Sequence, residues 1–246
     1  MQHDRERALP TGTTELVFNL GAERMRIFKD ELDEFGRQFK RSVVCGPHSR
    51  YFVLDTSQST PALGAHFRAG GASAFFCPNS EISESTVELE EIWGSRARDL
   101  HEILLHNASS TEQLFRVVEE ALRSHLGSKL TELHPAVDYA VHQLIASPAL
   151  HTVSKLEDET GYSPKHFIQL FRASVGLTPK VFSRIQRFQT AIARIARRER
   201  IDWAALAVDS GYYDQSHLNR EFRVFAGMTP GEYEPVSRER PSHVPA

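Results

Sequence analysis

An internal repeat in the second half of this 246-residue chain constrains its fold more than any other feature. LEDETGY at 156–162 corresponds to LAVDSGY at 206–212, at an offset of 50 residues. FIQLFRASVGLTP at 167–179 corresponds to LNREFRVFAGMTP at 218–230, at an offset of 51 residues. The second copy therefore has one extra residue in the turn between the two stretches. A repeat of this kind indicates two similar substructures built one after the other.

Each copy has the pattern of a short helix, a tight glycine turn and a second helix. Gly161 and Gly211 are predicted to close the two short helices, because glycine adopts the left-handed backbone conformation at little cost. Ser163, followed by Pro164, and Asp214 are predicted N-terminal caps of the second helices. This arrangement is a helix-turn-helix, whose second helix can enter the major groove of DNA.

The second helix of each copy has an apolar face and an outward stripe at the spacing i, i+3, i+4, i+7. The two stripes, which superpose at the offset of 51 residues, are Lys165, Ile168, Gln169 and Arg172 in the first copy and Ser216, Asn219, Arg220 and Arg223 in the second. Arginine can donate two hydrogen bonds to guanine, and glutamine or asparagine can pair in the same way with adenine. A solvated polar face is the alternative for a single helix, but two matching stripes favour contact with DNA.

A continuous helical pattern from Lys180 to Glu199 joins the two copies. Twenty residues at about 1.5 Å each span about 30 Å, close to the spacing of about 34 Å between successive major grooves on one face of DNA. Thr178–Pro179 is a predicted start for this helix, and Thr229–Pro230 is a predicted start for a further one. We expect one stiff helix to hold two reading helices about one turn of DNA apart.

The first half of the chain has a different pattern. Residues 12–92 contain short apolar or alternating runs bounded by turn residues, such as LVFNL at 16–20 and RYFVLD at 50–55, which predict strands. Helical spacing follows from residue 95, interrupted by NASS at 107–110, and predicts a helical hairpin. That hairpin fits a dimer interface and packing within the domain equally well.

The fold class is therefore α+β with two domains. The predicted organisation is a β-rich sensory or dimerisation domain at 1–127 with the hairpin at 95–127, a linker at 128–135, an all-α DNA-binding domain at 136–234, and a disordered tail at 235–246. The charge agrees with this division. Residues 1–135 hold 15 Lys and Arg against 20 Asp and Glu, a net of −5, whereas residues 136–246 hold 14 against 12, a net of +2.

Several function classes lack support in the sequence. No run approaches the roughly 18 apolar residues of a membrane helix, and the N-terminus lacks the pattern of a secretory signal. Cys45 and Cys77 are the two cysteines, so we expect a reduced, cytoplasmic protein without a disulfide framework. There is no His-x-His pair, phosphate loop or Ser-His-Asp arrangement, so no metal, cofactor or catalytic residue is predicted.

The repeat and its surroundings resemble a known family. GYSPKHFIQLFRASVGLTP, the long helix and WAALAVDSGYYDQSHLNREFRVFAGMTP are similar to the AraC/XylS-type DNA-binding domain over residues 136–234. The resemblance implies a transcription regulator whose two helix-turn-helix units read adjacent major-groove segments. Matching the family's base-facing positions gives Lys165, Ile168 and Gln169 in the first copy and Gln215, Ser216, His217, Asn219 and Arg220 in the second.

The first half resembles the cupin-like sensory domains of some of these regulators. The segments that carry this resemblance are LPTGTTELVFNLG, GPHSRYFVLD, HFRAGGASAFF and VELEEIWG. Related domains have more sequence ahead of the first segment. We therefore expect a barrel that lacks a strand or two and has an open edge. The resemblance leaves both a small-molecule effector and a homodimer as options.

The leading hypothesis is a sequence-specific transcription regulator that binds double-stranded DNA. One alternative is a cupin-like enzyme with an accessory DNA-binding module, which metal analysis of the purified protein would test. Another is a pure protein-interaction module, but a stripe with a single apolar residue, Ile168, favours DNA. The sequence does not identify the effector, the operator, or whether the regulator activates or represses.

Overall fold

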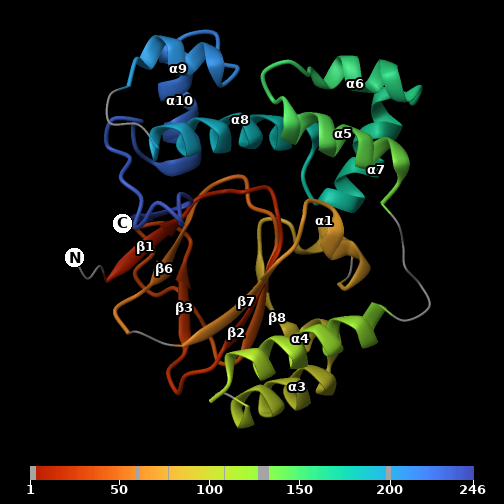
Figure 1. Ribbon diagram of the computed structural model, residues 1–246, viewed down its shortest axis with the longest axis vertical. Coiled ribbons are helices and arrows are strands. Elements are labelled where there is room, and N and C mark those ends of the chain that lie inside the picture. The colour runs from red at the N-terminus through yellow and green to blue at the C-terminus, as the bar shows by residue number, and fades with distance from the viewer. Residues whose placement is uncertain (1–3, 59–60, 77, 108, 127–132, 198–200) are drawn as a thin grey trace.

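The computed structural model describes residues 4–58, 61–76, 78–107, 109–126, 133–197 and 201–246. Figure 1 shows three tiers along the long axis: a helical unit at one end, two β-sheets in the middle, and a pair of helices at the other end. The chain has the predicted two-part α+β architecture, with all described strands except the C-terminal one in the first half and the repeat in the helical unit.

Two antiparallel sheets form the middle tier. In spatial order, the first consists of β4 (Arg37–Phe39), β3 (Met25–Phe28), β6 (Phe52–Asp55), β1 (Arg5–Ala8) and β9 (His243–Pro245), and the second of β7 (Ala62–His66), β2 (Glu15–Asn19), β5 (Ser42–Cys45) and β8 (Thr86–Glu88). Because side chains alternate along a strand, one set of residues faces the space between the sheets. In the second sheet the other set, which includes Leu16, Phe18 and Val44, packs against helices.

The helices of the first half cover the outer face of the second sheet. They are the short 3₁₀ helix η1 (Gly71–Ala74), α1 (Asn79–Ile82), α2 (Leu89–Trp93), α3 (Ser95–His106) and α4 (Thr111–Leu126). Leu104 of α3 and Val118 of α4 share a core with Phe18. The inner face of the hairpin therefore packs within its own domain.

The helical unit contains both copies of the repeat. Its elements are α5 (Pro135–Ala146), α6 (Val153–Thr160), α7 (Pro164–Val175), α8 (Pro179–Ile195), α9 (Trp203–Asp209) and α10 (Gln215–Ala226). Phe182 of α8 is buried with α5, α6 and α7, whereas Ile185, Phe188 and Ile192 are buried with α9 and α10. One helix thus supplies side chains to two separate cores.

The helix that joins the copies is shorter than predicted. It ends at Ile195, and its 17 residues span about 26 Å at about 1.5 Å each. The predicted continuation to Glu199 falls partly on residues 198–200, which lie outside the described residues.

The predicted helix start at Thr229–Pro230 is wrong. The backbone N–H of Thr229 donates to the Glu232 carboxylate at 2.7 Å, and the segment forms only a turn.

The other helix ends follow the sequence closely. Asp214 accepts the backbone N–H of His217 at 2.7 Å, and Thr178 accepts that of Val181 at 3.4 Å. Ser163 is the cap residue before Pro164, although its side chain makes no capping bond. Gly161 and Gly211 have positive φ, at 73° and 84°, where other residues are strained.

The expectation of a disordered tail at 235–246 is wrong. In the structure β9 pairs with β1, and Val244 is fully buried in the core beneath α8. Arg240 donates to Glu6 at 3.1 Å. The proline-rich, charged composition suggested disorder, but the open edge of β1 supplies the hydrogen-bond partners that such a segment cannot make alone. The predicted linker at 128–135 falls mainly on residues 128–132, which lie outside the described residues.

Replacing Val244 with alanine tests whether the C-terminal strand stabilises the whole chain. We expect Val244→Ala to lower the free energy of unfolding by about 1–2 kcal/mol, because a fully buried side chain loses two methyl groups. Urea denaturation measures this loss. Val208→Ala, at a position 62% exposed on α9, is the control and should change stability by less than about 0.5 kcal/mol. Equal effects for the two variants would contradict the prediction.

Candidate nucleic-acid interface

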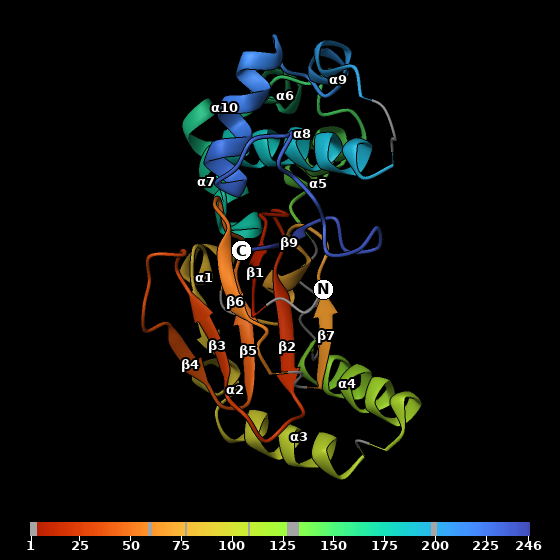
Figure 2. The ribbon, with the colours of Figure 1, turned by 90° about the vertical axis from the view of Figure 1, so that its left-hand side faces the viewer.

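The second helices of the two repeats, α7 and α10, stand at opposite ends of α8 (Figure 1) and on the same side of it (Figure 2). Their C-terminal glycines, Gly176 and Gly227, approach the β-sheet half. Their N-terminal ends therefore point away from the sheets, toward open space. Each helix packs its apolar face on its own core, so the two opposite faces look outward on a common side.

Most of the predicted DNA-contacting side chains are exposed on these faces. Those classed as exposed are Lys165, Ile168, Gln169 and Arg172 on α7, and Gln215, Ser216, Arg220 and Arg223 on α10. Asn219 and His217 are half-buried. The His217 ring packs edge-on against Tyr212, with ring centroids 5.3 Å apart, so it is less available than its neighbours.

The extra residue in the second turn separates two tyrosines that the sequence presents as a pair. Tyr212 is buried, whereas Tyr213 is 89% exposed directly before the N-terminus of α10. Tyr162 occupies the matching turn of the first copy and is also exposed. Sequence reasoning missed Tyr213. The offset between the two copies increases from 50 to 51 residues at this turn, and this increase was the signal that could have identified Tyr213.

The two copies are attached to the rest of the unit by different contacts. The Arg184 guanidinium of α8 donates two hydrogen bonds to the Glu221 carboxylate of α10, at 2.9 and 2.8 Å. Glu221 is only 7% exposed. In the first copy the matching position is Leu170, which is part-buried against an apolar core. At this position an ion pair therefore attaches α10 to α8, whereas α7 makes an apolar contact.

The β-sheet half contains a partly open cavity of about 1160 Å³ between its two sheets. Its walls mix apolar side chains, such as Val17 and Phe52, with the carboxylates of Glu6 and Glu15. Arg240 and His243 of the C-terminal segment also line it. Burial raises the pKa of the Cys45 thiol in this wall to about 12, so it is protonated near neutral pH. Cys77 lies outside the described residues.

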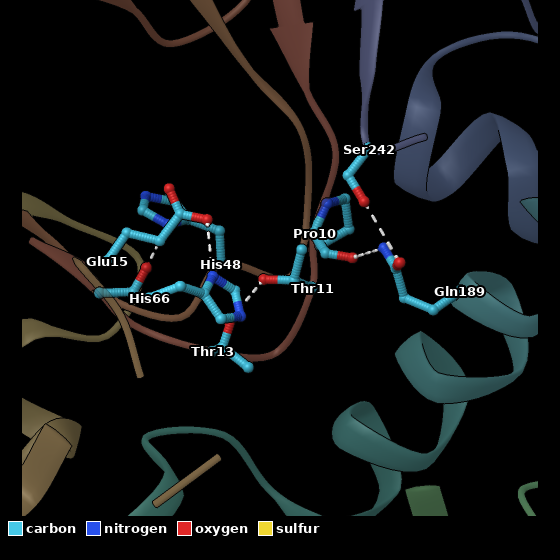
Figure 3. Close-up of polar contacts among 9 residues, drawn as sticks. Pro10, Thr11, Thr13, Glu15, His48, His66, Gln189 and Ser242 are labelled. Atoms are coloured by element: carbon cyan, nitrogen blue, oxygen red, sulfur yellow. Dashed lines mark hydrogen bonds and ion pairs between the residues drawn. The ribbon is translucent and has the colours of Figure 1, made fainter. Parts of the chain in front are cut away.

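The cavity half is joined to α8 by the loop at 9–14. The side-chain amide of Gln189 donates to the Pro10 carbonyl at 2.7 Å, and that of Gln186 donates to the Thr11 carbonyl at 3.1 Å. Figure 3 shows Gln189 reaching both Pro10 and Ser242, so one side chain of α8 holds the loop and the C-terminal segment together.

A histidine fixes the far end of the same loop. His66 of β7 lies 3.2 Å from both the Thr13 hydroxyl and the Glu15 carboxylate (Figure 3). This bridge ties the loop that contacts α8 to the strand beside it.

The described residues contain no group of three or more His, Cys, Asp or Glu side chains that could hold a metal ion. Among the helices that the structure describes, none combines the length and apolar character needed to cross a membrane.

Comparisons with known proteins support the fold of both halves. Residues 156–235 match the family described as a helix-turn-helix domain, and residues 2–88 match a domain of unknown function (DUF6597). No curated protein matches the chain. The structure of ToxT from Vibrio cholerae is similar at 10% identity and a TM-score of 0.55, covering 94% of each chain.

Two further solved structures are similar over different lengths. ToxT bound to (E)-4-(8-methylnaphthalen-1-yl)but-3-enoic acid is 9% identical, with a TM-score of 0.52 over 94% of each chain. The DNA-binding domain of AdpA in complex with a target DNA is 22% identical, with a TM-score of 0.36 over 40% of this chain and 88% of that chain. The likeness to ToxT confirms the two-domain fold. The cupin-like character of the first half stays a prediction.

The Arg184–Glu221 pair can be tested by removing one partner and then both. Arg184→Met should lower the free energy of unfolding by about 2 kcal/mol, because Glu221 is left as a buried charge without its partner. Adding Glu221→Leu, the residue type of the first copy, should restore stability to within about 1 kcal/mol of the original protein. Urea denaturation of the single and double variants provides the comparison. A double variant no more stable than Arg184→Met would contradict this account.

The His66–Glu15 contact should make stability depend on pH. The hydrogen bond raises the pKa of His66 above 6.5 and lowers the pKa of Glu15 below 4.5. The contact stabilises the folded protein fully between pH 4.5 and pH 6.5, the ordinary pKa values of the two groups. This stabilisation is lost as pH rises through the raised pKa of His66, and also as pH falls through the lowered pKa of Glu15. Unfolding measured for the original protein and His66→Gln should differ more at about pH 5.5 than at about pH 8.5. An equal difference at both would rule out the charged pair.

Proposed function

We propose that this chain is a DNA-binding transcription regulator of the AraC/XylS type, in which α7 and α10 enter two successive segments of the major groove on one face of the duplex. The observation that carries this proposal is that α7 and α10 lie on the same side of α8 (Figure 2) and that most residues of their matching stripes are exposed. Recognition helices about one helical turn apart can occupy adjacent grooves without bending either helix.

The side chains divide into those that recognise bases and those that add affinity. Gln169, Asn219 and Arg220 have the donor and acceptor patterns that distinguish base edges in the major groove. Lys165, Arg172 and Arg223 add positive charge beside the phosphates, where binding depends steeply on salt. Tyr213 joins this surface as an exposed aromatic side chain next to α10.

The cavity between the sheets is the proposed effector site. Its volume of about 1160 Å³ slightly exceeds the range of about 300–1,000 Å³ that is common for ligand pockets, so a small molecule fits inside it. Its mixed lining suits a ligand with both apolar and polar groups. ToxT, which shares the fold, has been solved with a small organic acid bound. The sensory half would then be residues 1–127 together with the C-terminal strand, and we propose that the protein acts in the cytoplasm.

Selection of bound sequences from a random DNA pool tests the function directly. We expect one enriched sequence with two conserved segments about one helical turn apart. Recovered pools without an enriched sequence would show that the protein does not read bases. A single conserved segment would show that only one of the two helices reads.

Arg220→Ala tests the base-reading role of α10. We expect a loss of about 1–3 kcal/mol in binding to the selected site, with relaxed preference at one base pair. Titration of labelled site variants at fixed salt measures both effects. The control is Arg116→Ala on α4, which removes the same charge from an exposed helix in the other half and should leave binding unchanged. Equal losses for both variants would indicate a general charge effect.

A further inference from the structure

One loop of the sensory half contacts the C-terminal ends of both recognition helices. This bridging loop, residues 46–51, joins β5 to β6 in the middle of the molecule. Pro47 near its start lies against the end of α7, and Tyr51 at its end lies against the end of α10. The two helices contact opposite ends of α8, so the loop provides a second connection between them.

The contact with α7 leaves no free space. A methyl group added to Gly176, the residue that ends α7, would lie 2.6 Å from Cγ of Pro47 and 2.9 Å from the Asn79 carbonyl oxygen. The side-chain amide of Asn79 donates to the Ser174 carbonyl at 2.6 Å. Both contacts fix the last turn of α7 against the sensory half.

The contact with α10 is equally close. A methyl group added to Gly227 would lie 2.7 Å from Cε1 of Tyr51. The backbone N–H of Tyr51 donates to the Phe225 carbonyl at 3.2 Å, and the Arg7 guanidinium donates to the Ala226 carbonyl at 3.1 Å. The sensory half thus satisfies carbonyl groups that the last turn of a helix leaves without intrahelical partners.

The bridging loop is itself held rigidly from the other side. Glu84 donates its backbone N–H to the Pro47 carbonyl at 3.0 Å, and its carboxylate accepts the Ser49 backbone N–H at 3.0 and 3.1 Å. Glu84 has a φ of 58°, an unfavourable conformation for this residue type. Strain of this kind persists only where the surrounding contacts require it. Here those contacts hold the bridging loop in place.

The loop also continues directly from the wall of the cavity. Cys45 and Phe52, the residues immediately before and after it, both line the space between the sheets. The His48 ring packs against Phe52, with ring centroids 4.8 Å apart. A shift of either wall strand would therefore move the loop.

We propose that the bridging loop sets the distance between α7 and α10, and so determines which spacing between two DNA segments the protein prefers. Tyr51 and Pro47 are the positioning residues. This inference rests on the proposed function, and it adds a role in specificity for residues that do not contact DNA. Two linked recognition helices bind DNA more tightly together than either does alone only when their separation matches that of the two DNA segments.

The test uses DNA in which the two selected segments are moved closer or apart by single base pairs. The original protein should prefer its selected spacing over neighbouring ones by about tenfold, and Tyr51→Ala should reduce this preference to about twofold. Its affinity for a single segment should change by less than about twofold. Arg50→Gln, at an exposed position on the same loop, is the control and should keep the original preference.

The outcomes separate the two proposals. If Tyr51→Ala keeps the original spacing preference, the loop does not set the distance. If the original protein itself selects no sequence, the proposed function fails whatever the loop does. Tyr51→Phe, which retains the ring against Gly227, should behave like the original protein. A loss of preference in this variant would assign the effect to the hydroxyl group's bond with Glu31 and overturn the packing argument.

A second measurement checks the Tyr51–Gly227 contact without DNA. Gly161 and Gly227 both end their helices with nearly the same backbone angles, φ 73° and ψ 9° against φ 68° and ψ 9°. Space is open around Gly161 and closed around Gly227. Gly227→Ala should therefore lower the Tm more than Gly161→Ala, and the excess should disappear when Tyr51→Ala is added. If Gly227→Ala still lowers the Tm more than Gly161→Ala when Tyr51→Ala is present, the contact argument and the proposal are both wrong.

Discussion

The burial of α8 along its whole length is the constraint on which the rest of the structure depends. Phe182 belongs to the core of the first helix-turn-helix, and Ile185, Phe188 and Ile192 belong to the core of the second. Because both cores close on the same helix, neither reading helix can shift without disturbing a packed apolar face. The burial of α8 therefore limits the range of separations between the outward stripes, and the bridging loop is proposed to set the separation within that range.

The β-sheet half adds a second set of connections to the same helix. Gln186 and Gln189 hold the loop at 9–14, and Val244 of the C-terminal strand is buried in the core beneath α8. Leu9 shares that core. The two halves thus share an apolar core as well as polar contacts. The packed side chains of Leu9 and Val244 therefore connect α8 to Ala8 and His243, their chain neighbours that line the cavity.

The C-terminal strand illustrates how composition can mislead. Its prolines and charges are typical of disordered segments, yet Arg240 donates to the buried Glu6 at 3.1 Å, and a ring nitrogen of His243 lies 3.3 Å from the same carboxylate. The interaction partners come from β1, more than 230 residues earlier in the chain. A local pattern carries no information about a partner at that distance. The same strand covers the sheet edge that was expected to be open.

The sequence by itself determined the repeat, its glycine turns, most of its helix caps and the residue types of the two stripes. These features depend on neighbours within a few positions, where periodicity and backbone preference dominate. Only the tertiary structure decided that Tyr213 is exposed while Tyr212 is buried, and that Glu221 pairs with Arg184. It also decided that one loop contacts both reading helices. Such contacts join residues that are distant in sequence, and they form only once the cores have brought those residues together.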